Sequence, residues 1–459
     1  MAGPASKARA RLSLLAVHPA RAVVVAFAGV IVVGTVLLSL PIASADGTEP
    51  GFVTALFTST SAVCVTGLAV VDTGTYWSGF GQGVILALIQ VGGFGIMTMA
   101  SLLALLISGR LRLRLQLTAQ AETRSLAIGD VRRVLLGVAG TTLAVELAVG
   151  AVLAVRLREG YGESIGDSVY LGYFHAVSAF NNAGFGLHAD SLTGYAQDAW
   201  ILLPIAAAVI LGGIGFPVLL ELLRHRRRRR TTGRRNWTLH TKLTVITTVV
   251  LLAAGTVLTC LLEWTNAGTL GPHTVAGKIL DGFFHSVMSR TAGFNSLDID
   301  AMRASTLLMT CVLMFIGGGS AGTAGGIKVT TFAVLAAAML AEMRGEPASV
   351  MLGRRLAPHT LRQALTVALA GIGVVIASTL TLLAMTGYPM ESVLFEVVSA
   401  FGTVGMSTGI TAGLPTGGHL LLVGLMFIGR LGPITLVSAL ALRERTRRYE
   451  LPEERPVIG

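Results

Sequence analysis

The sequence predicts an all-α integral membrane protein in which four pseudo-symmetric helix–pore-loop–helix repeats surround a central axis. Three observations lead to this fold class. Hydrophobic residues make up 53% of the 459 residues and charged residues only 13%, which is outside the range of ordinary soluble domains. Apolar segments of spanning length recur along the chain. Between them, a short motif that ends in glycine occurs four times.

About eight apolar segments approach the ~20 residues that cross a bilayer as a helix. They cover residues 21–41, 82–107, 134–156, 199–223, 242–263, 305–343, 362–386 and 418–442. The segment 305–343 is too long for one uninterrupted span, and the glycine-rich run FIGGGSAGTAGGIKVTT lies in its middle. We therefore expect about eight spans, with a break in the sixth.

The formal net charge of +11 would also suit a nucleic-acid-binding protein, but the positions of the basic residues favour a membrane topology. Lys and Arg gather in alternate connections, namely the N-terminus, residues 110–133, 224–242 and 344–362, and the tail from Arg443. By the positive-inside rule, both termini are then cytoplasmic. We expect the basic residues to face the lipid bilayer surface and expect no nucleic-acid partner.

Four stretches of sequence align without gaps when their final glycines are superimposed. They are FTSTSAVCVTG (57–67), FHAVSAFNNAG (174–184), FFHSVMSRTAG (283–293) and FEVVSAFGTVG (395–405). A second aligned feature follows each of them: VGGFG (91–95), LGGIG (211–215), IGGGS (316–320) and IGRLG (428–432). Each copy therefore indicates one unit, made of a spanning helix, a short helix, a glycine-containing turn and a second spanning helix.

A short helix of about ten residues cannot cross a bilayer, and non-helical backbone at membrane depth is tolerated only inside protein or beside water. Four such segments that converge on one axis satisfy both conditions. Their carbonyl groups can replace the hydration shell of a cation, and the glycines allow the dihedrals that this requires. Close helix packing could explain the glycine pairs at 92–93 and 212–213, but not four aligned Phe-to-Gly stretches. The sequence thus favours a central cation pore.

The motifs VCVTG, FNNAG, SRTAG and FGTVG, the interrupted sixth span and an arginine in the last span resemble the Trk/Ktr/HKT superfamily of potassium transporters. The resemblance covers nearly the whole chain and is greatest to the membrane subunit of bacterial Ktr systems. It implies potassium uptake across the cell inner (plasma) membrane through a channel-like pore made by one chain. Such a protein is a transporter and not an enzyme.

The resemblance also implies a selectivity filter that binds K+ through the backbone carbonyls of four loops. Its expected residues are Val65, Thr66, Gly67, Asn182, Ala183, Gly184, Thr291, Ala292, Gly293, Thr403, Val404 and Gly405. Glycine at position 67 favours potassium, because serine there accompanies sodium permeation in the family. All four copies depart from a TVGYG-like filter, which leaves the stringency of selection open.

The glycine-rich run does not have the spacing of a phosphate-binding loop, because Ile327 separates Gly326 from Lys328. By resemblance it is an intramembrane gating loop, whose polar groups obstruct the pathway and whose glycines allow it to move. A purely structural break in the helix is the alternative. The expected gate residues are Gly317, Gly318, Gly319, Ser320, Gly322, Thr323, Gly325, Gly326, Lys328 and Arg430.

Arg430 takes the position that Gly93, Gly213 and Gly318 occupy in the other copies, so we expect it to project toward the axis. A charge at the bilayer centre costs roughly 2.5–3.5 kcal/mol and usually has a function or a partner. Below the filter, an arginine would repel cations and could bind loop carbonyls. The alternative is an ion pair with a buried acid such as Glu146 or Glu221.

These assignments divide the chain as follows. We expect a cytoplasmic N-terminus at 1–18, pore-loop repeats at 19–110, 130–228, 238–345 and 360–443, the gating loop at 317–328 and a cytoplasmic tail at 444–459. The cytoplasmic loops are too short for a nucleotide-binding domain. The resemblance therefore implies control by a separate cytosolic ring of Ktr-type nucleotide-binding regulatory subunits, and a homodimer.

No covalently bound cofactor is expected, and K+, with Na+ as the alternative, is the transported or coupling ion. Within the family, a less selective Na+/K+ pathway or a Trk-type subunit remains as an alternative. A secondary transporter usually shows two related halves, whereas this chain shows four copies of one orientation. A membrane enzyme would need catalytic residues inside its spans, and the sequence contains no such group.

Overall fold

The computed structural model describes residues 19–116, 128–228, 237–346 and 348–432. These residues are mostly helical, which confirms the predicted fold class, and their only strands form a short hairpin, β1 (Val350–Met351) with β2 (Arg354–Arg355). The expected N-terminal segment 1–18, the tail 444–459 and most of the arginine run at 224–235 lie outside the described residues.

The helices follow one another in the order that the repeats predict. The first unit contains α2 (Pro19–Leu38), α3 (Phe52–Val63), α4 (Thr73–Tyr76) and α5 (Gly79–Gln116). The second contains α6 (Ile128–Tyr161), α7 (Ile165–Phe180), α8 (Ala199–Gly213) and α9 (Phe216–Arg228). The third contains α10 (Leu239–Glu263), α11 (Val275–Met288), α12 (Ala304–Phe315) and α13 (Val329–Met343). The fourth contains α14 (Pro358–Met385), α15 (Met390–Gly402) and α16 (Thr416–Leu431), and single 3-10 turns lie at Pro41–Ala43, Thr193–Tyr195 and Thr411–Gly413.

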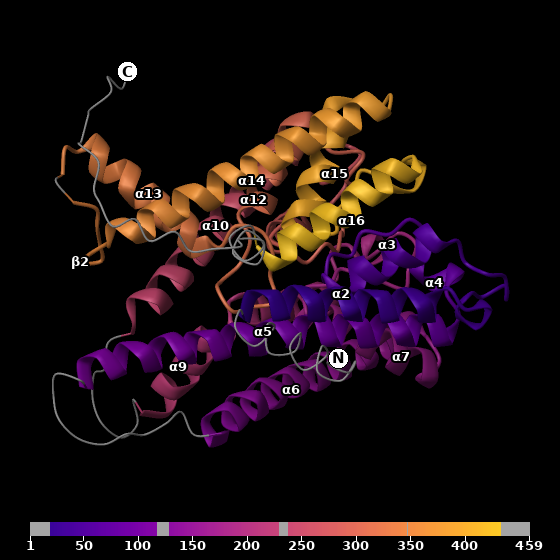
Figure 1. Ribbon diagram of the computed structural model, residues 1–459. Helices are drawn as coiled ribbons and strands as arrows, with labels where there is room; N and C mark the ends of the chain where they lie inside the picture. The colour runs from indigo at the N-terminus through magenta and orange to yellow at the C-terminus, as the bar shows by residue number, and fades with distance from the viewer. Residues whose placement is uncertain (1–18, 117–127, 229–236, 347, 433–459) are drawn as a thin grey trace, which may run out of the picture.

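Contacts between the helices close in a ring. The short helices α3, α7, α11 and α15 each pack against the long helix that precedes them. Each of them also contacts, in another unit, the helix that follows the short helix and its turn. These pairs are α3 with α16, α7 with α5, α11 with α8, and α15 with α12. Figure 1 shows α2, α5 and α6 running side by side, with α14 and α16 together on the opposite side. The unit-to-unit contacts therefore return from the end of the chain to its beginning.

Hydroxyl and carboxylate caps fix where several helices start. Ser164, Thr238 and Thr274 accept a hydrogen bond from the backbone N–H three residues later, at the start of α7, α10 and α11. Asp198 does the same for Trp200 N–H at the start of α8. Each cap satisfies a backbone donor that the first turn of a helix leaves without a partner.

Three described helices are long and apolar enough to cross a membrane, namely Leu135–Tyr161, Leu239–Glu263 and Pro358–Met385. A fourth candidate is bent: Ala199–Gly213 and Phe216–Leu223 meet at 103°. One continuous helix over 199–223 is therefore wrong. The turn depends on Gly215, whose φ of +97° is open to glycine but costly for other residues.

The other expected spans coincide with shorter apolar helices, among them Val23–Leu38, Gly79–Gly95 and Thr416–Leu431. The expected break within 305–343 is present, because α12 ends at Phe315 and α13 begins only at Val329. The total of eight spans stays a prediction.

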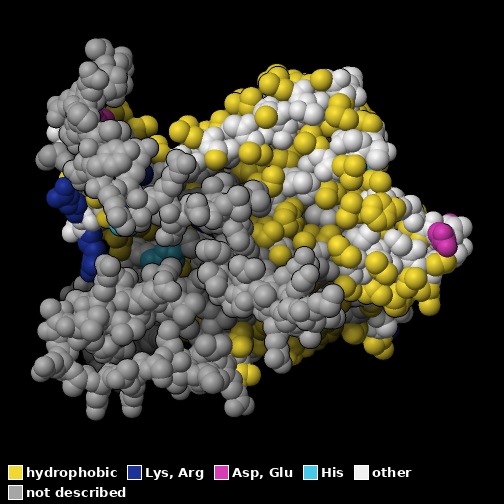
Figure 2. Space-filling view, in the orientation of Figure 1, with side chains coloured by type: hydrophobic (Ala, Val, Ile, Leu, Met, Phe, Trp, Pro, Cys, Tyr) yellow, Lys and Arg dark blue, Asp and Glu magenta, His cyan; other side chains and the backbone are white. Residues whose placement is uncertain are grey.

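Surface chemistry differs between the two ends of the molecule. In Figure 2, apolar side chains cover much of the described part of the visible face, Lys and Arg gather at one end, and the most prominent Asp and Glu patch lies at the opposite end. Arg354 and Arg355 of the hairpin are exposed, as are Asp46 and Glu49 between α2 and α3. A broad apolar face between two polar ends is the surface of a membrane protein.

Glycine allows the second long helix of a unit to touch the end of its short helix. A Cβ on Gly92 in α5 would overlap the carbonyl oxygen of Val63, the last residue of α3. Gly212 makes the same approach to Phe180 at the end of α7. These aligned glycines therefore set how closely the helices behind each turn can pack.

We predict that Gly92→Ala lowers the stability of the protein by about 1–3 kcal/mol, the usual cost of overpacking a core. The matched control is Gly83→Ala in the same helix, since a Cβ there meets nothing within 4 Å. The measurement is the temperature at which detergent-purified protein loses its single size-exclusion peak. Equal temperatures for the two variants would contradict the packing argument.

Candidate cation pathway

Each short helix is followed by a turn of the same unusual conformation. The residue two positions before the final glycine has a left-handed φ in every unit: Val65 55°, Asn182 59°, Thr291 79° and Thr403 50°. The glycines follow with φ values of 91° at Gly67, 70° at Gly184, 74° at Gly293 and 98° at Gly405. Positive φ is costly for β-branched residues such as valine and threonine, and such strain clusters at functional sites.

The four glycines meet in a closed ring. A Cβ on Gly67 would overlap the carbonyl oxygen of Ala183 and lie 3.0 Å from Cα of Gly184. The same relation links Gly184 to Ala292 and Gly293, Gly293 to Val404 and Gly405, and Gly405 back to Thr66 and Gly67. The structure thus brings all four predicted turns together. The carbonyl group before each glycine lies against the glycine of a neighbouring turn, in space that only glycine leaves open.

The short helices hold these turns by hydrogen bonds that repeat from unit to unit. The backbone N–H groups of Thr66, Ala183 and Val404 donate to the carbonyl groups of Ser61, Ser178 and Ser399, respectively. The hydroxyl oxygens of Ser61 and Ser399 also accept from the N–H of Gly67 and Gly405, each at 3.1 Å.

The third unit has Val287 in place of this serine and uses a different bond. There the carbonyl group of Met288 accepts from both Ala292 N–H and Gly293 N–H, at 3.0 and 3.2 Å. A second backbone hydrogen bond therefore takes the place of the bond to the absent hydroxyl group.

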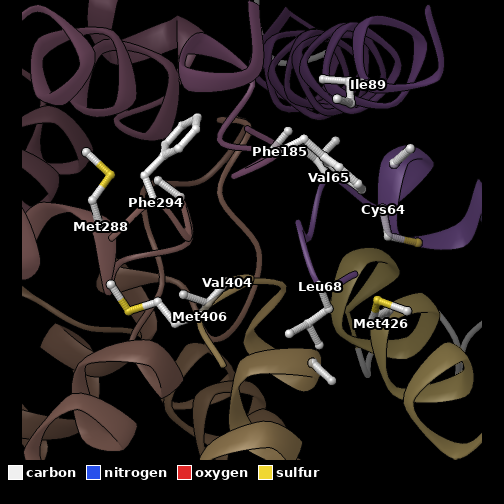
Figure 3. Close-up of a cluster of buried hydrophobic side chains, with 14 of the residues drawn as sticks. Cys64, Val65, Leu68, Ile89, Phe185, Met288, Phe294, Val404, Met406 and Met426 are labelled. Atoms are coloured by element: carbon white, nitrogen blue, oxygen red, sulfur yellow. The ribbon is translucent and has the colours of Figure 1, made fainter. Parts of the chain in front are cut away.

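Apolar side chains pack behind the ring. The residue after each glycine, namely Leu68, Phe185, Phe294 or Met406, is at most 1% exposed and belongs to the main hydrophobic core. Figure 3 shows these side chains, with Val65 and Val404, around the extended segments that carry the glycines. Because the side chains are buried in this core, the ring itself presents mostly backbone.

A cavity of about 300 Å³ lies next to the ring. Its lining includes all four ring glycines and residues of the segments that follow them, such as Asp72 and His188. The ring therefore forms one wall of a space into which polar groups also project.

The glycine-rich loop, residues 316–328, contacts three of the four turns. Thr323 Oγ1 donates a 2.7 Å hydrogen bond to Asn182 Oδ1 of the second turn. A Cβ on Gly317 would lie 3.4 Å from Cγ2 of Thr291 in the third turn, and one on Gly325 would overlap the Thr403 hydroxyl in the fourth.

The loop fits into the bend between α8 and α9. Gly319 N–H donates to the carbonyl group of Gly213 at 2.8 Å, and Thr323 N–H donates to that of Gly212 at 3.2 Å. In return, Phe216 N–H donates to the carbonyl group of Ala321 at 3.2 Å. Gly318, Gly319 and Gly322 all lie so close to backbone of Gly213 or Ile214 that a Cβ would not fit, and Gly326 has a φ of +62°.

The loop also pairs with itself and with the helix that follows. Gly317 N–H donates to the carbonyl group of Ile327 at 2.8 Å, which joins the two ends of the loop. Lys328, directly before α13, donates from Nζ to the carbonyl group of Ala324 at 2.6 Å. The Ser320 and Thr330 hydroxyls lie 3.2 Å apart. The break thus has a defined conformation.

Arg430 reaches this loop from α16. Its side chain is 5% exposed, and Nη1 donates to the backbone carbonyl group of Thr323. The two acids considered as partners are engaged elsewhere: Glu146 binds Gln90 and Asn181, and Glu221 binds Thr238 and Thr241. An ion pair of Arg430 with either acid is therefore not formed, and the arginine binds the loop instead.

Sequence reasoning missed a second buried arginine. Arg290, three residues before Gly293, is 7% exposed and donates to backbone carbonyl groups of Thr248 and Gly317. The available signal was a charged residue among the small, uncharged residues of SRTAG.

The chain matches one protein-family model, described as TrkH, cation transport protein, over residues 3–447. It is 40% identical over 433 residues to the Ktr system potassium uptake protein B of Bacillus subtilis, which covers 94% of this chain and 95% of that protein. It is 38% identical over 441 residues to the protein of the same name from Vibrio alginolyticus, covering 96% of this chain and 94% of that protein.

A further relative, the potassium/sodium uptake protein NtpJ of Enterococcus hirae, is 32% identical over 459 residues, covering 99% of each chain. The fold is similar to the crystal structure of the potassium transporter TrkH from Vibrio parahaemolyticus, with a TM-score of 0.70 and 18% identity, over 91% of this chain and 85% of that chain. With a family match that spans almost its whole length, this chain belongs to the TrkH family of cation transport proteins.

Proposed function

We propose that this protein takes up potassium across the cell membrane, and that the ion passes through the ring of four glycine turns. The observation that carries the proposal is the closed ring itself, in which a carbonyl group from each unit lies against the glycine of a neighbouring unit. The names of the Bacillus subtilis and Vibrio alginolyticus relatives, both potassium uptake proteins, support potassium as the ion.

In this proposal the turns form a selectivity filter. Carbonyl groups of the two residues before each glycine replace water around K+, and the left-handed dihedrals direct them. The turns directly follow the C-terminal ends of α3, α7, α11 and α15, so the partial negative charges of four helix ends also favour a cation there. The apolar wall behind the turns keeps their backbone in place.

The glycine-rich loop is the gate in this proposal. It contacts three of the four turns, and Arg430 fixes its middle by binding the carbonyl group of Thr323. A buried positive charge beside the pathway opposes a passing cation, because desolvated charges interact strongly. The loop must therefore leave this position, and Arg430 must lose its acceptor, before ions pass.

The same proposal includes a cytosolic partner. The Bacillus subtilis and Vibrio alginolyticus relatives are each named protein B of a Ktr system, which supports a separate partner subunit; we propose that this partner is a ring of nucleotide-binding regulatory subunits. We place both termini and the hairpin arginines Arg354 and Arg355 on the cytoplasmic side, where basic residues are enriched in membrane proteins. A homodimer belongs to this proposal as well.

A less selective sodium/potassium pathway is the second candidate. The name of the Enterococcus hirae relative, a potassium/sodium uptake protein, favours it. Uptake of rubidium into proteoliposomes, with potassium or sodium as competitor, separates the two candidates. Potassium should compete and sodium should not if the filter is selective.

We predict that Gly67→Ser reduces the preference for potassium over sodium by about tenfold, equivalent to about 1.4 kcal/mol. Gly67 has a φ of +91°, and a side chain there would displace the carbonyl group of Ala183 from the ring. The preference is measured by competition in the rubidium uptake assay.

The matched control for this variant is Gly47→Ser. Gly47 also has a positive φ, +72°, but a Cβ there meets nothing within 4 Å. This control should retain the selectivity of the unchanged protein. If Gly67→Ser keeps the preference for potassium over sodium, or if Gly67→Ser and Gly47→Ser lose it equally, the ring is not the filter.

We predict that deleting residues 318–326 raises rubidium uptake by the purified chain about tenfold, because the obstruction and its hydrogen bonds are removed. Arg430→Gln should raise uptake in the same direction, since it removes the charge that holds Thr323. Arg344→Gln, at an exposed arginine that follows α13, is the control and should leave uptake unchanged. Uptake that falls or stays constant after the deletion would reject the loop as a gate.

A further inference from the structure

Arg290 links the third turn to the start of the glycine-rich loop. It lies between Ser289, the residue directly after α11, and Thr291, which has the left-handed φ of 79°. Its Nη2 donates to the carbonyl group of Gly317 at 3.1 Å, two residues beyond the end of α12. The side chain thus joins the turn that carries it to the place where the loop leaves its helix.

The second nitrogen of the same guanidinium group is tied to a long helix. Nη1 donates to the backbone carbonyl group of Thr248 in α10 at 3.2 Å. Both acceptors are neutral carbonyl groups, so among the described residues this buried cation has no carboxylate partner. A planar guanidinium can reach two acceptors at once, whereas a lysine ammonium acts as a point charge on a shorter reach.

The other units have no equivalent of this link. The aligned residues are Cys64, Asn181 and Gly402, of which Asn181 binds Gln90 and Glu146 and not the loop. The long glycine-rich break between α12 and α13 belongs to the third unit, and the third unit also carries the arginine. The position of Arg290 therefore corresponds to the position of the break.

The packing beside Arg290 leaves a small void. A small cavity of about 20 Å³ is lined by Arg290, Thr248 and Gly318, together with residues of the second unit that include Asn182. This volume is close to that of one water molecule, and two polar atoms in this region, Arg290 Nε and Thr248 Oγ1, are buried without a protein partner. The cavity therefore has room for about one water molecule beside two polar atoms that have no protein partner.

We propose that Arg290 is a positioning residue that holds the glycine-rich loop in its closed place and couples it to the third turn of the ring. The inference rests on the proposed gate function of that loop. Arg430 of the fourth unit holds the middle of the loop, and Arg290 of the third unit holds its beginning. When the loop moves, Gly317 leaves Arg290, and the turn that carries Arg290 loses one of its two anchors.

The test is a double-variant experiment on uptake. Arg290→Met keeps a long unbranched side chain but removes both hydrogen bonds, so rubidium uptake by the purified full chain should rise about tenfold. In the chain that lacks residues 318–326, the same substitution should change uptake by less than about twofold, because there is no loop left to hold. Potassium preference is measured in both backgrounds.

Two variants serve as controls. Arg156→Met also removes an arginine contact, the 2.9 Å pair of the partly exposed Arg156 with the buried Asp198. This pair is far along the chain from the loop, so the variant should leave uptake per folded molecule unchanged. Arg290→Lys keeps the charge but loses the planar fork that directs two nitrogens to two separate carbonyl groups, so uptake should rise as with Arg290→Met. It also provides the test if the methionine variant does not fold.

The outcomes separate the inference from the function on which it rests. If the deletion raises uptake but Arg290→Met and Arg290→Lys do not, the positioning role is wrong and the gate stands. An equal change in both backgrounds would show that Arg290 acts on the ring or on passing cations directly, which also overturns the inference. If the deletion itself fails to raise uptake, the gate proposal is wrong.

Discussion

Backbone that is not helical must pair its polar groups inside the protein or face water when it lies within a membrane, and this constraint governs the centre of the molecule. Four turns carry such backbone, and they meet in one ring where each glycine makes room for the carbonyl group of its neighbour. The ring in turn dictates the arrangement of the helices. Short helices must end at it, and α5, α8, α12 and α16 must approach those ends closely enough that glycine is required at Gly92 and Gly212.

The same constraint explains why the ring and the glycine-rich loop are contiguous. The break between α12 and α13 frees backbone groups that need partners, and the bend between α8 and α9 supplies them through Gly212 and Gly213. Side chains complete the pairing, since Asn182 of the second turn binds Thr323, and Arg430 binds its carbonyl group. The loop is therefore held by hydrogen bonds to several separate elements, which would have to break before it could move as the proposed function requires.

Much of this architecture could be predicted from the sequence because the same glycine-ending motif recurs in each of the four units. The aligned glycines at 67, 184, 293 and 405 predict turns, and the ring then follows from the need to bury them. The bend at Gly215 was not predicted, because LGGIG lies inside an apolar run that also suits a straight helix. The contact of Arg290 with Gly317 joins residues 27 apart across two elements, and only tertiary packing determines it. The alignment put Arg430 among glycines, which indicates a position that faces the centre, and in the structure its side chain contacts the loop; its role in a gate stays a prediction.

The central claim is that a cation binds within the ring of Gly67, Gly184, Gly293 and Gly405. The most direct measurement is an anomalous difference map from crystals of the protein grown with rubidium in place of potassium. The account predicts a peak on the axis of the ring, in contact with the backbone oxygens of Thr66, Ala183, Ala292 and Val404. A map without density in the ring, and with rubidium bound reproducibly at another site inside the protein, would contradict it.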